Sequence, residues 1–167
     1  MKDCTVLLEA SEDDFAELIE DRAPRGLSLS DSALAPAPVL QMLGGLAQSI
    51  RCTFAPAAWM IVEDGGEIVG LCSITKLLDE GGIDIGYGIA PTRQGRGVAT
   101  KAISALLKWA QNDLRVNFVT AETSVNNRAS QRVLETNHFV RVGERQDAED
   151  GELICWKFDL RSMPQTS

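Results

Sequence analysis

Residues 83–99 read IDIGYGIAPTRQGRGVA, and the pattern changes twice along this stretch. Ile83–Ile89 alternates large apolar residues with an acid and two glycines, and this period of two predicts a strand with one apolar face. Pro91 ends the strand, because proline cannot donate a hydrogen bond to a sheet. After the glycines, apolar residues recur at helical spacing over 98–112. The stretch therefore predicts a strand, a glycine-rich loop and an amphipathic helix in direct succession.

The polar face of the 83–89 strand carries one carboxylate, Asp84, followed by Gly86 and Gly88, which have no side chains. Glycine inside a strand marks a bulge or a close approach by a ligand or another backbone. Bare backbone beside a carboxylate would suit a narrow acyl group and an incoming amine. A bulge covered by a packed helix is the alternative.

The start of the 98–112 helix has the features of an anion site. The first amides of a helix lack internal partners, and the helix dipole favours negative charge there. Gly95 and Gly97 let the loop curl, so that main-chain amides can approach phosphate oxygens. Basic residues also gather here, in a chain of formal net charge −8: Arg93, Arg96 and Lys101. We expect a phosphate-binding loop; a plain turn with solvated charges is the alternative.

Two other nucleotide-binding loops fit this segment less well. A Walker loop would end in Gly-Lys-Ser/Thr, which is missing. The dinucleotide fingerprint would run through Gly95 and Gly97 to a third glycine, where the chain has Thr100, although Glu122 lies where a ribose-binding acid would be expected. The segment also follows an antiparallel hairpin rather than opening a parallel sheet, which disfavours a dinucleotide-binding oxidoreductase.

The rest of the chain predicts an α/β (α+β) fold. Expected strands cover 5–9, 59–62, 68–74, 83–89, 117–123, 139–144 and 152–160, and expected helices cover 13–21, 39–49, 98–112 and 129–136. Ser11 is a plausible cap of the first helix, whereas Gly44-Gly45 should interrupt the second. Arg22–Pro38 is expected to be a loop or a broken helical lid. We predict a mixed, mainly antiparallel twisted sheet of about six to seven strands with helices on both faces.

Composition narrows the class of protein. The 167 residues predict one domain over 1–167, with a core of about 4–160 and a frayed tail at 161–167. The net negative charge argues against nucleic acid as a partner. The N-terminal residues do not read as a signal peptide and no apolar run could cross a membrane, so we expect a cytoplasmic protein. Four scattered cysteines without a CxxC pair, and a single histidine, predict reduced thiols that are mostly buried in strands, and no metal site.

Three motifs in the right order resemble the GNAT superfamily of acyl-CoA N-acyltransferases. The pyrophosphate-loop pattern Gln/Arg-x-x-Gly-x-Gly/Ala is matched by Gln94-x-x-Gly97-x-Ala99. The preceding acid-x-Gly-Tyr-x-Ile-x-Pro is matched by Asp84 to Pro91, and the later Asn-x-x-Ser-x-Arg-Val-Leu-Glu by Asn127 to Glu135, followed by Phe139. The chain looks most like the branch that includes the ribosomal-protein N-terminal acetyltransferases. The close match covers about 83–142.

This resemblance implies a site for acetyl-CoA, used as a co-substrate without a metal. The pantetheine arm would lie between the 83–89 and 117–123 strands, which splay apart, and an N–H near Ile89 would polarise the thioester carbonyl. Asp84 occupies the family's acidic position and is the first candidate for the general base, with Glu122 second. The residues implied in coenzyme A binding are Ile89, Gln94, Gly95, Arg96, Gly97, Val98, Ala99, Thr100 and Asn127.

The chain departs from the family pattern at two places. Many members carry a tyrosine as general acid where this chain has Leu134. The branch it resembles can use a serine hydroxyl or water, which points to Ser130, although Ser130 could equally cap a helix. The family's Leu-Gly-Phe is replaced by Asn137-His138-Phe139, and His138 at a helix C-terminus is expected to be structural rather than catalytic.

The resemblance implies direct transfer of acetyl from acetyl-CoA to a primary amine, of a small molecule or a protein N-terminus, in a ternary complex. The alternative is a non-catalytic sensor that binds acyl-CoA. Acceptor choice is expected to depend on 22–49 and 144–152, and formation of a homodimer is left open.

Overall fold

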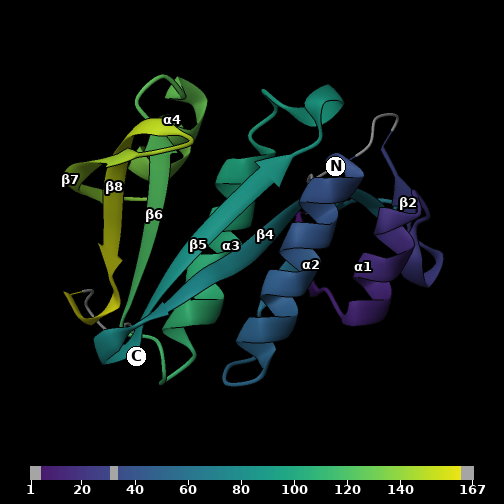
Figure 1. Ribbon diagram of the computed structural model, residues 1–167, viewed down its shortest axis with the longest axis horizontal. Helices are drawn as coiled ribbons and strands as arrows, with labels where there is room; N and C mark the ends of the chain where they lie inside the picture. The colour runs from purple at the N-terminus through teal and green to yellow at the C-terminus, as the bar shows by residue number, and fades with distance from the viewer. Residues whose placement is uncertain (1–4, 31–33, 163–167) are drawn as a thin grey trace.

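The computed structural model describes residues 5–30 and 34–162, which form one sheet flanked by helices (Figure 1). Within these residues the sheet has eight strands in the order β1-β3-β4-β5-β6-β8-β7, and β2 pairs with β4. The strands are β1 Val6–Glu9, β2 Ser28–Leu29, β3 Ala58–Glu63, β4 Glu67–Leu78, β5 Gly82–Ile89, β6 Phe118–Ser124, β7 Val140–Asp147 and β8 Gly151–Asp159. Most neighbours are antiparallel, and the predicted mixed sheet is confirmed.

Helices cover both faces of the sheet, as predicted. The helices are α1 Glu12–Ile19, α2 Ala37–Arg51, α3 Val98–Gln111 and α4 Arg128–Thr136. Figure 1 shows α1 and α2 on the near face and α3 and α4 behind the sheet. Among the described residues, no helix is long and apolar enough to cross a membrane.

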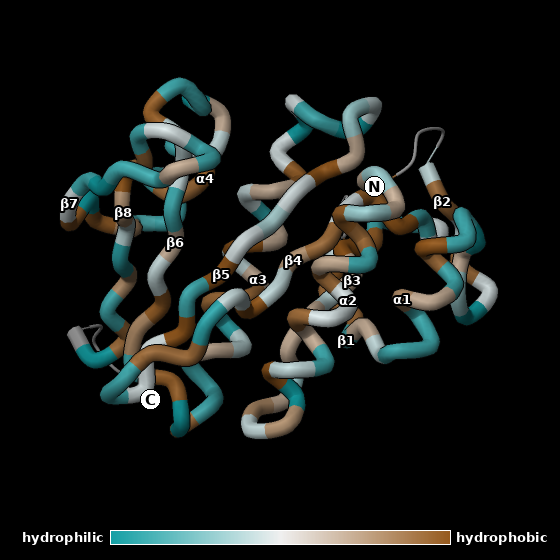
Figure 2. The backbone as a smooth tube through the Cα atoms, in the orientation of Figure 1, coloured by the Kyte–Doolittle hydropathy of each residue, from teal (hydrophilic) through white to brown (hydrophobic). Residues whose placement is uncertain are grey.

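The core is thickest at β3 and β4, which lie between the two helix layers. Both strands are buried on both faces over most of their length. Their sequences are therefore nearly continuous runs of apolar residues, without the alternation of apolar and polar residues that a half-exposed strand has. Figure 2 shows these hydrophobic segments in the interior and hydrophilic ones toward β7. Buried residues of α3, such as Ile103 and Leu106, pack against this sheet from behind.

The two central strands separate partway along their length. β5 and β6 pair in parallel from Gly82, opposite Phe118, to Ile85, opposite Ala121. Beyond this point no ladder joins them, although β5 continues to Ile89 and β6 to Ser124. The predicted splay is therefore confirmed, and it opens the sheet beside the glycine-rich loop (Figure 1).

Two predictions about the first third of the chain were wrong. The segment expected to be a loop or lid contains β2, whose two residues were too few to give a periodic signal. Helix α2 also runs unbroken through Gly44. A Cβ at Gly44 would lie 3.3 Å from Cγ of Phe15, so this glycine allows close packing of α1 against α2. That packing stabilises the helix despite the low helical propensity of glycine.

The chain end is ordered further than predicted. Leu160–Ser162 form a 3-10 turn, and the Arg161 amide donates to Oδ1 of Asp159. The remainder of the expected frayed tail, 163–167, lies outside the described residues, as does Cys4. Of the other cysteines, Cys72 is buried in β4 and Cys155 is partly buried in β8, whereas Cys52 is exposed at the end of α2.

Asp14 fastens the start of α1 to the segment that follows the helix. Ser11 caps α1 as predicted, and Asp14 completes a capping box by accepting from the Ser11 amide at 2.8 Å. Asp14 also pairs with Arg25, whose Nη2 contacts the carboxylate and donates to the carbonyl of Glu9 at 2.7 Å. Burial alone would raise the pKa of Asp14, but the hydrogen bonds from Arg25 and Ser11 outweigh it and hold the pKa below its usual value.

Replacing Asp14 by Ala should lower the free energy of unfolding by about 2 kcal/mol, because a buried carboxylate pair and a cap are lost while Arg25 is partly exposed. Asp13→Ala removes a charge from the same turn at an exposed position, and it should lower the free energy of unfolding by about 0.5 kcal/mol or less.

The contribution of Asp14 to stability should depend on pH, because its pKa is lower in the folded protein than the ordinary value of 3.8. The stabilisation should be complete above pH 3.8 and should be lost as the pH falls through the folded-state pKa. Urea unfolding of the three proteins against pH measures this; equal losses in both variants would contradict it.

Candidate functional site

The glycine-rich loop leads directly into α3. Gly95 and Gly97 have φ of +79° and +77°, in the left-handed region that favours glycine. Gly97 is the N-cap of α3 and has no side chain to cap it, and its carbonyl accepts from the Lys101 amide at 3.1 Å. The amides of Val98 to Thr100 are those that an α-helix leaves without an internal acceptor. The loop thus ends in a set of main-chain donors.

These donors border a cleft of about 450 Å³. It lies among the end of β5, the loop, the first turn of α3 and the start of α4. Its lining residues are Tyr87, Gly88, Ile89, Arg93, Gln94, Gly95, Gly97, Val98, Ala99, Thr100, Asn127, Ala129, Ser130, Arg132 and Val133. Every predicted coenzyme A contact except Arg96 is in this lining, whereas Asp84 and Glu122 are not.

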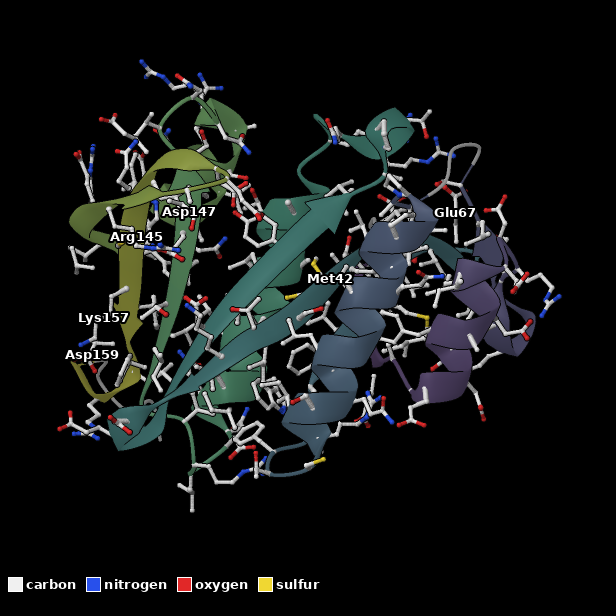
Figure 3. The ribbon with its side chains drawn as sticks, viewed as in Figure 1. Met42, Glu67, Arg145, Asp147, Lys157 and Asp159 are labelled. Atoms are coloured by element: carbon white, nitrogen blue, oxygen red, sulfur yellow. The ribbon has the colours of Figure 1, made fainter. Side chains whose placement is uncertain are left out.

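Side chains fix the loop to the sheet. The Gln94 Nε2 donates to the carbonyl of Ile89 at 3.0 Å, which ties the loop back to the end of β5. Arg93 pairs through Nε with Glu67 at 2.7 Å, at the start of β4 (Figure 3). The side chains of this pair are only 16% and 28% exposed, so Arg93 is committed to holding the loop.

Helix α4 forms the opposite wall of the cleft. Its N-cap is Asn127, whose Oδ1 accepts from the Ser130 amide at 3.1 Å. The alternative in which Ser130 caps the helix is therefore wrong. Ser130 lies in the first turn of α4 and lines the cleft. At the other end, Asn137 Nδ2 donates to the Thr100 carbonyl of α3 at 3.2 Å, which joins the two cleft walls.

Tyr87 is a cleft residue that the sequence did not single out. The sequence placed it on the apolar face of β5, together with three isoleucines. In the structure its hydroxyl donates to the Ser130 carbonyl at 3.3 Å, across the space between β5 and α4. Burial raises the pKa of Tyr87 to about 12, so the phenol stays protonated at neutral pH. The sequence did contain one indication of this role, because Tyr87 carries a hydroxyl on a strand face that is otherwise apolar.

Asp84 lies on the other face of β5 from this cleft. Its two carboxylate oxygens accept from Thr75 Oγ1 at 2.5 Å and from Thr120 Oγ1 at 2.6 Å. Thr75 lies at an irregularity of β4, between Ile74 and Lys76. The bulge is therefore in β4, the strand that pairs with β5, and not in β5 itself. Each carboxylate oxygen has a second acceptor position, so Asp84 can also bind a water molecule.

Gly86 and Gly88 of β5 are not covered by a packed helix. A Cβ at Gly88 would meet nothing within 4 Å, and one at Gly86 would only touch Thr75 at 3.4 Å. The bare strand therefore faces space at the point where β5 and β6 separate. This geometry fits a ligand that approaches the backbone better than it fits a filled bulge.

Glu122 lies on the same face as Asp84 but is paired. Arg145 of β7 contacts both of its carboxylate oxygens, with Nη2 to Oε1 at 3.0 Å, and Arg145 also approaches Asp147 (Figure 3). The hydrogen bond from Arg145 is the main cause that holds the pKa of Glu122 below its usual value. A carboxylate held in this way is a weaker base.

His138 is the last residue that the sequence analysis named. His138 follows α4 with φ of +68°, where the family pattern has glycine, and it is exposed. This position at a helix end agrees with the predicted structural role. Among residues 5–30 and 34–162, no group of three His, Cys, Asp or Glu side chains is placed to hold a metal ion.

Comparisons with known proteins agree on a family. The model of the acetyltransferase (GNAT) domain matches residues 6–140. The uncharacterized N-acetyltransferase p20 of Bacillus licheniformis is 29% identical over 98 residues, covering 57% of this chain and 55% of p20. The uncharacterized N-acetyltransferase YjdG of Bacillus subtilis (strain 168) is 33% identical over 85 residues, covering 50% of this chain and 51% of YjdG. The matches thus span about half the length of these curated relatives.

A solved structure has the same fold. RimL, a ribosomal L7/L12 alpha-N-protein acetyltransferase in complex with coenzyme A, superposes with a TM-score of 0.68 at 18% identity, and the match covers 93% of each chain. At this identity, the likeness describes the fold alone.

Proposed function

This chain belongs to the GNAT acetyltransferase family, and from that premise we propose that it transfers acetyl from acetyl-CoA to a primary amine. The observation that carries the proposal is the cleft at the start of α3, where left-handed glycines and uncapped amides meet the open end of β5. RimL, whose fold is similar, binds coenzyme A.

The cleft has groups suited to each part of coenzyme A. The amides of Val98 to Thr100 and the helix dipole would bind the diphosphate. Asn127 would contact the pantetheine arm from α4, and the arm would then enter the gap between β5 and β6. Acetyl-CoA supplies the acetyl group as a thioester.

Main-chain groups at Gly88 and Ile89 would hold the thioester end. Because Gly88 has no side chain and open space beside it, a ligand can reach the strand here. An amide donor aimed at the carbonyl oxygen would stabilise the negative charge that develops there, which is worth roughly 10²–10³ in rate.

The amine would approach from the face of the sheet that carries Asp84, opposite the coenzyme A cleft. An amine must be neutral to attack, so a base must accept its proton, directly or through water. At the usual rise per residue, Gly88 lies about 13 Å along the strand from Asp84. This distance is too long for direct proton transfer, so we assign Asp84 the role of accepting the proton through water molecules. Glu122 is less suited, since Arg145 lowers its pKa.

The leaving thiolate would need a proton or a hydrogen-bond donor. We assign this task to the Ser130 hydroxyl, because Ser130 lines the cleft at the start of α4. The Tyr87 phenol is a poor proton donor, because its pKa is about 12, and its hydroxyl already donates to the Ser130 carbonyl. Holding both reactants together would lower the entropic part of the barrier.

Release of the free thiol from acetyl-CoA, measured with a panel of small amines and peptides with free N-termini, tests this function. We expect turnover with at least one acceptor and no thiol release without it. Tight binding of acetyl-CoA with no turnover across the panel would favour the non-catalytic sensor instead.

A further inference from the structure

Arg132 is a cation in the cleft wall to which the proposed function gives no task. It projects from α4, is exposed and lines the cleft. The other arginine of the lining, Arg93, is paired with Glu67. For Arg132, no ion pair or side-chain hydrogen bond is present within the described residues.

The contacts of α4 fix the place of Arg132 along the cleft. Near its start, the Ser130 carbonyl accepts from Tyr87, at the end of the cleft toward the gap between β5 and β6. After its last turn, Asn137 donates to the Thr100 carbonyl, at the first turn of α3. Arg132 lies between these points, so its long side chain can reach the phosphate end.

Local charge favours an anion at this place. Between residues 85 and 121 the chain has five basic residues and one acid, Asp113, and between 123 and 134 it has Arg128 and Arg132 without an acid. The whole chain has a net charge of −8. A highly charged anion would therefore be drawn to this side of the molecule and repelled from the rest.

We propose that Arg132 binds the 3′-phosphate of coenzyme A. The assignment rests on the proposed function, because it needs coenzyme A in this cleft. Main-chain amides of α3 can take the diphosphate, which leaves the ribose phosphomonoester as the remaining anionic group. That group carries a charge of about −1.5 to −2 at neutral pH, and a guanidinium can bind it with two parallel hydrogen bonds.

Calorimetric titration with coenzyme A and with dephospho-coenzyme A, which lacks only the 3′-phosphate, tests the assignment. The wild-type protein should prefer coenzyme A about tenfold, a modest value because the contact is exposed to solvent. In Arg132→Gln the two ligands should bind about equally. Arg128→Gln is the matched control: it removes the same charge one helical turn away, outside the cleft lining, and should keep most of the preference.

The outcomes separate the two proposals. If coenzyme A does not bind to the wild-type protein, the proposed function fails. If coenzyme A binds but the wild-type protein does not prefer it to dephospho-coenzyme A, only the 3′-phosphate assignment fails. An equal loss of affinity for both ligands in Arg132→Gln would place the arginine on the diphosphate and also overturn the assignment, as would an equal loss of preference in Arg128→Gln.

Discussion

Replacing Gly97 by Asp should weaken coenzyme A binding by about 100-fold or more while the protein stays folded. Gly97 lines the cleft at the N-cap of α3, and a side chain there would project into open space. Two like charges about 4 Å apart repel by about 4 kcal/mol near a protein surface, which is enough for this loss of affinity. Asp adopts the left-handed conformation more readily than most residues, so the free energy of unfolding should fall by no more than about 1–2 kcal/mol.

Gly97→Asn is the control for size and backbone strain. Asn has the same shape and adopts the left-handed conformation, but it carries no charge. We expect its affinity for coenzyme A to lie well above that of the Asp variant. Calorimetry on both proteins measures the difference. If the Asp variant bound coenzyme A as tightly as the wild-type protein, the start of α3 would not be the diphosphate site.

Asp84→Asn should lower the turnover number about 100-fold or more and leave the affinity for acetyl-CoA nearly unchanged. The size of the effect is that of losing a general base. Asn can keep hydrogen bonds to Thr75 and Thr120, because their hydroxyls both donate and accept. The variant should therefore fold like the wild-type protein, which urea unfolding checks.

Glu122→Gln is the matched control for Asp84. It removes a carboxylate from the same face of the neighbouring strand, but one already paired with Arg145. Its turnover should fall about tenfold or less. The affinity for acetyl-CoA gives a second measurement, since it should be nearly unchanged in both variants. A turnover number in Asp84→Asn equal to that of Glu122→Gln would remove this carboxylate from the mechanism.

The sequence predicted the fold well where the pattern was local. The hairpin of β3 and β4, the strand-loop-helix over 83–111 and the helix that became α4 each have a clear periodicity or turn signal. β2 and the close packing at Gly44 were missed, because both depend on contacts with segments distant in sequence. Such contacts leave little trace in a local pattern.

The candidate site was predicted in part for the same reason. The loop residues from Gln94 to Thr100, apart from Arg96, line the cleft, and they could be singled out because glycines and a helix start are visible in the sequence. The partners of Asp84 come from β4 and β6, and the partner of Glu122 comes from β7, so their environments required the folded sheet. The positions of Tyr87 and Arg132 in one cleft depend on how α4 crosses toward α3.

A crystal structure of the protein with coenzyme A tests the central claim most directly. The diphosphate should lie within hydrogen-bond distance of main-chain amides between Gly95 and Thr100, with the thiol directed between β5 and β6. A ligand bound elsewhere, or a loop whose own side chains fill the start of α3, would contradict the account.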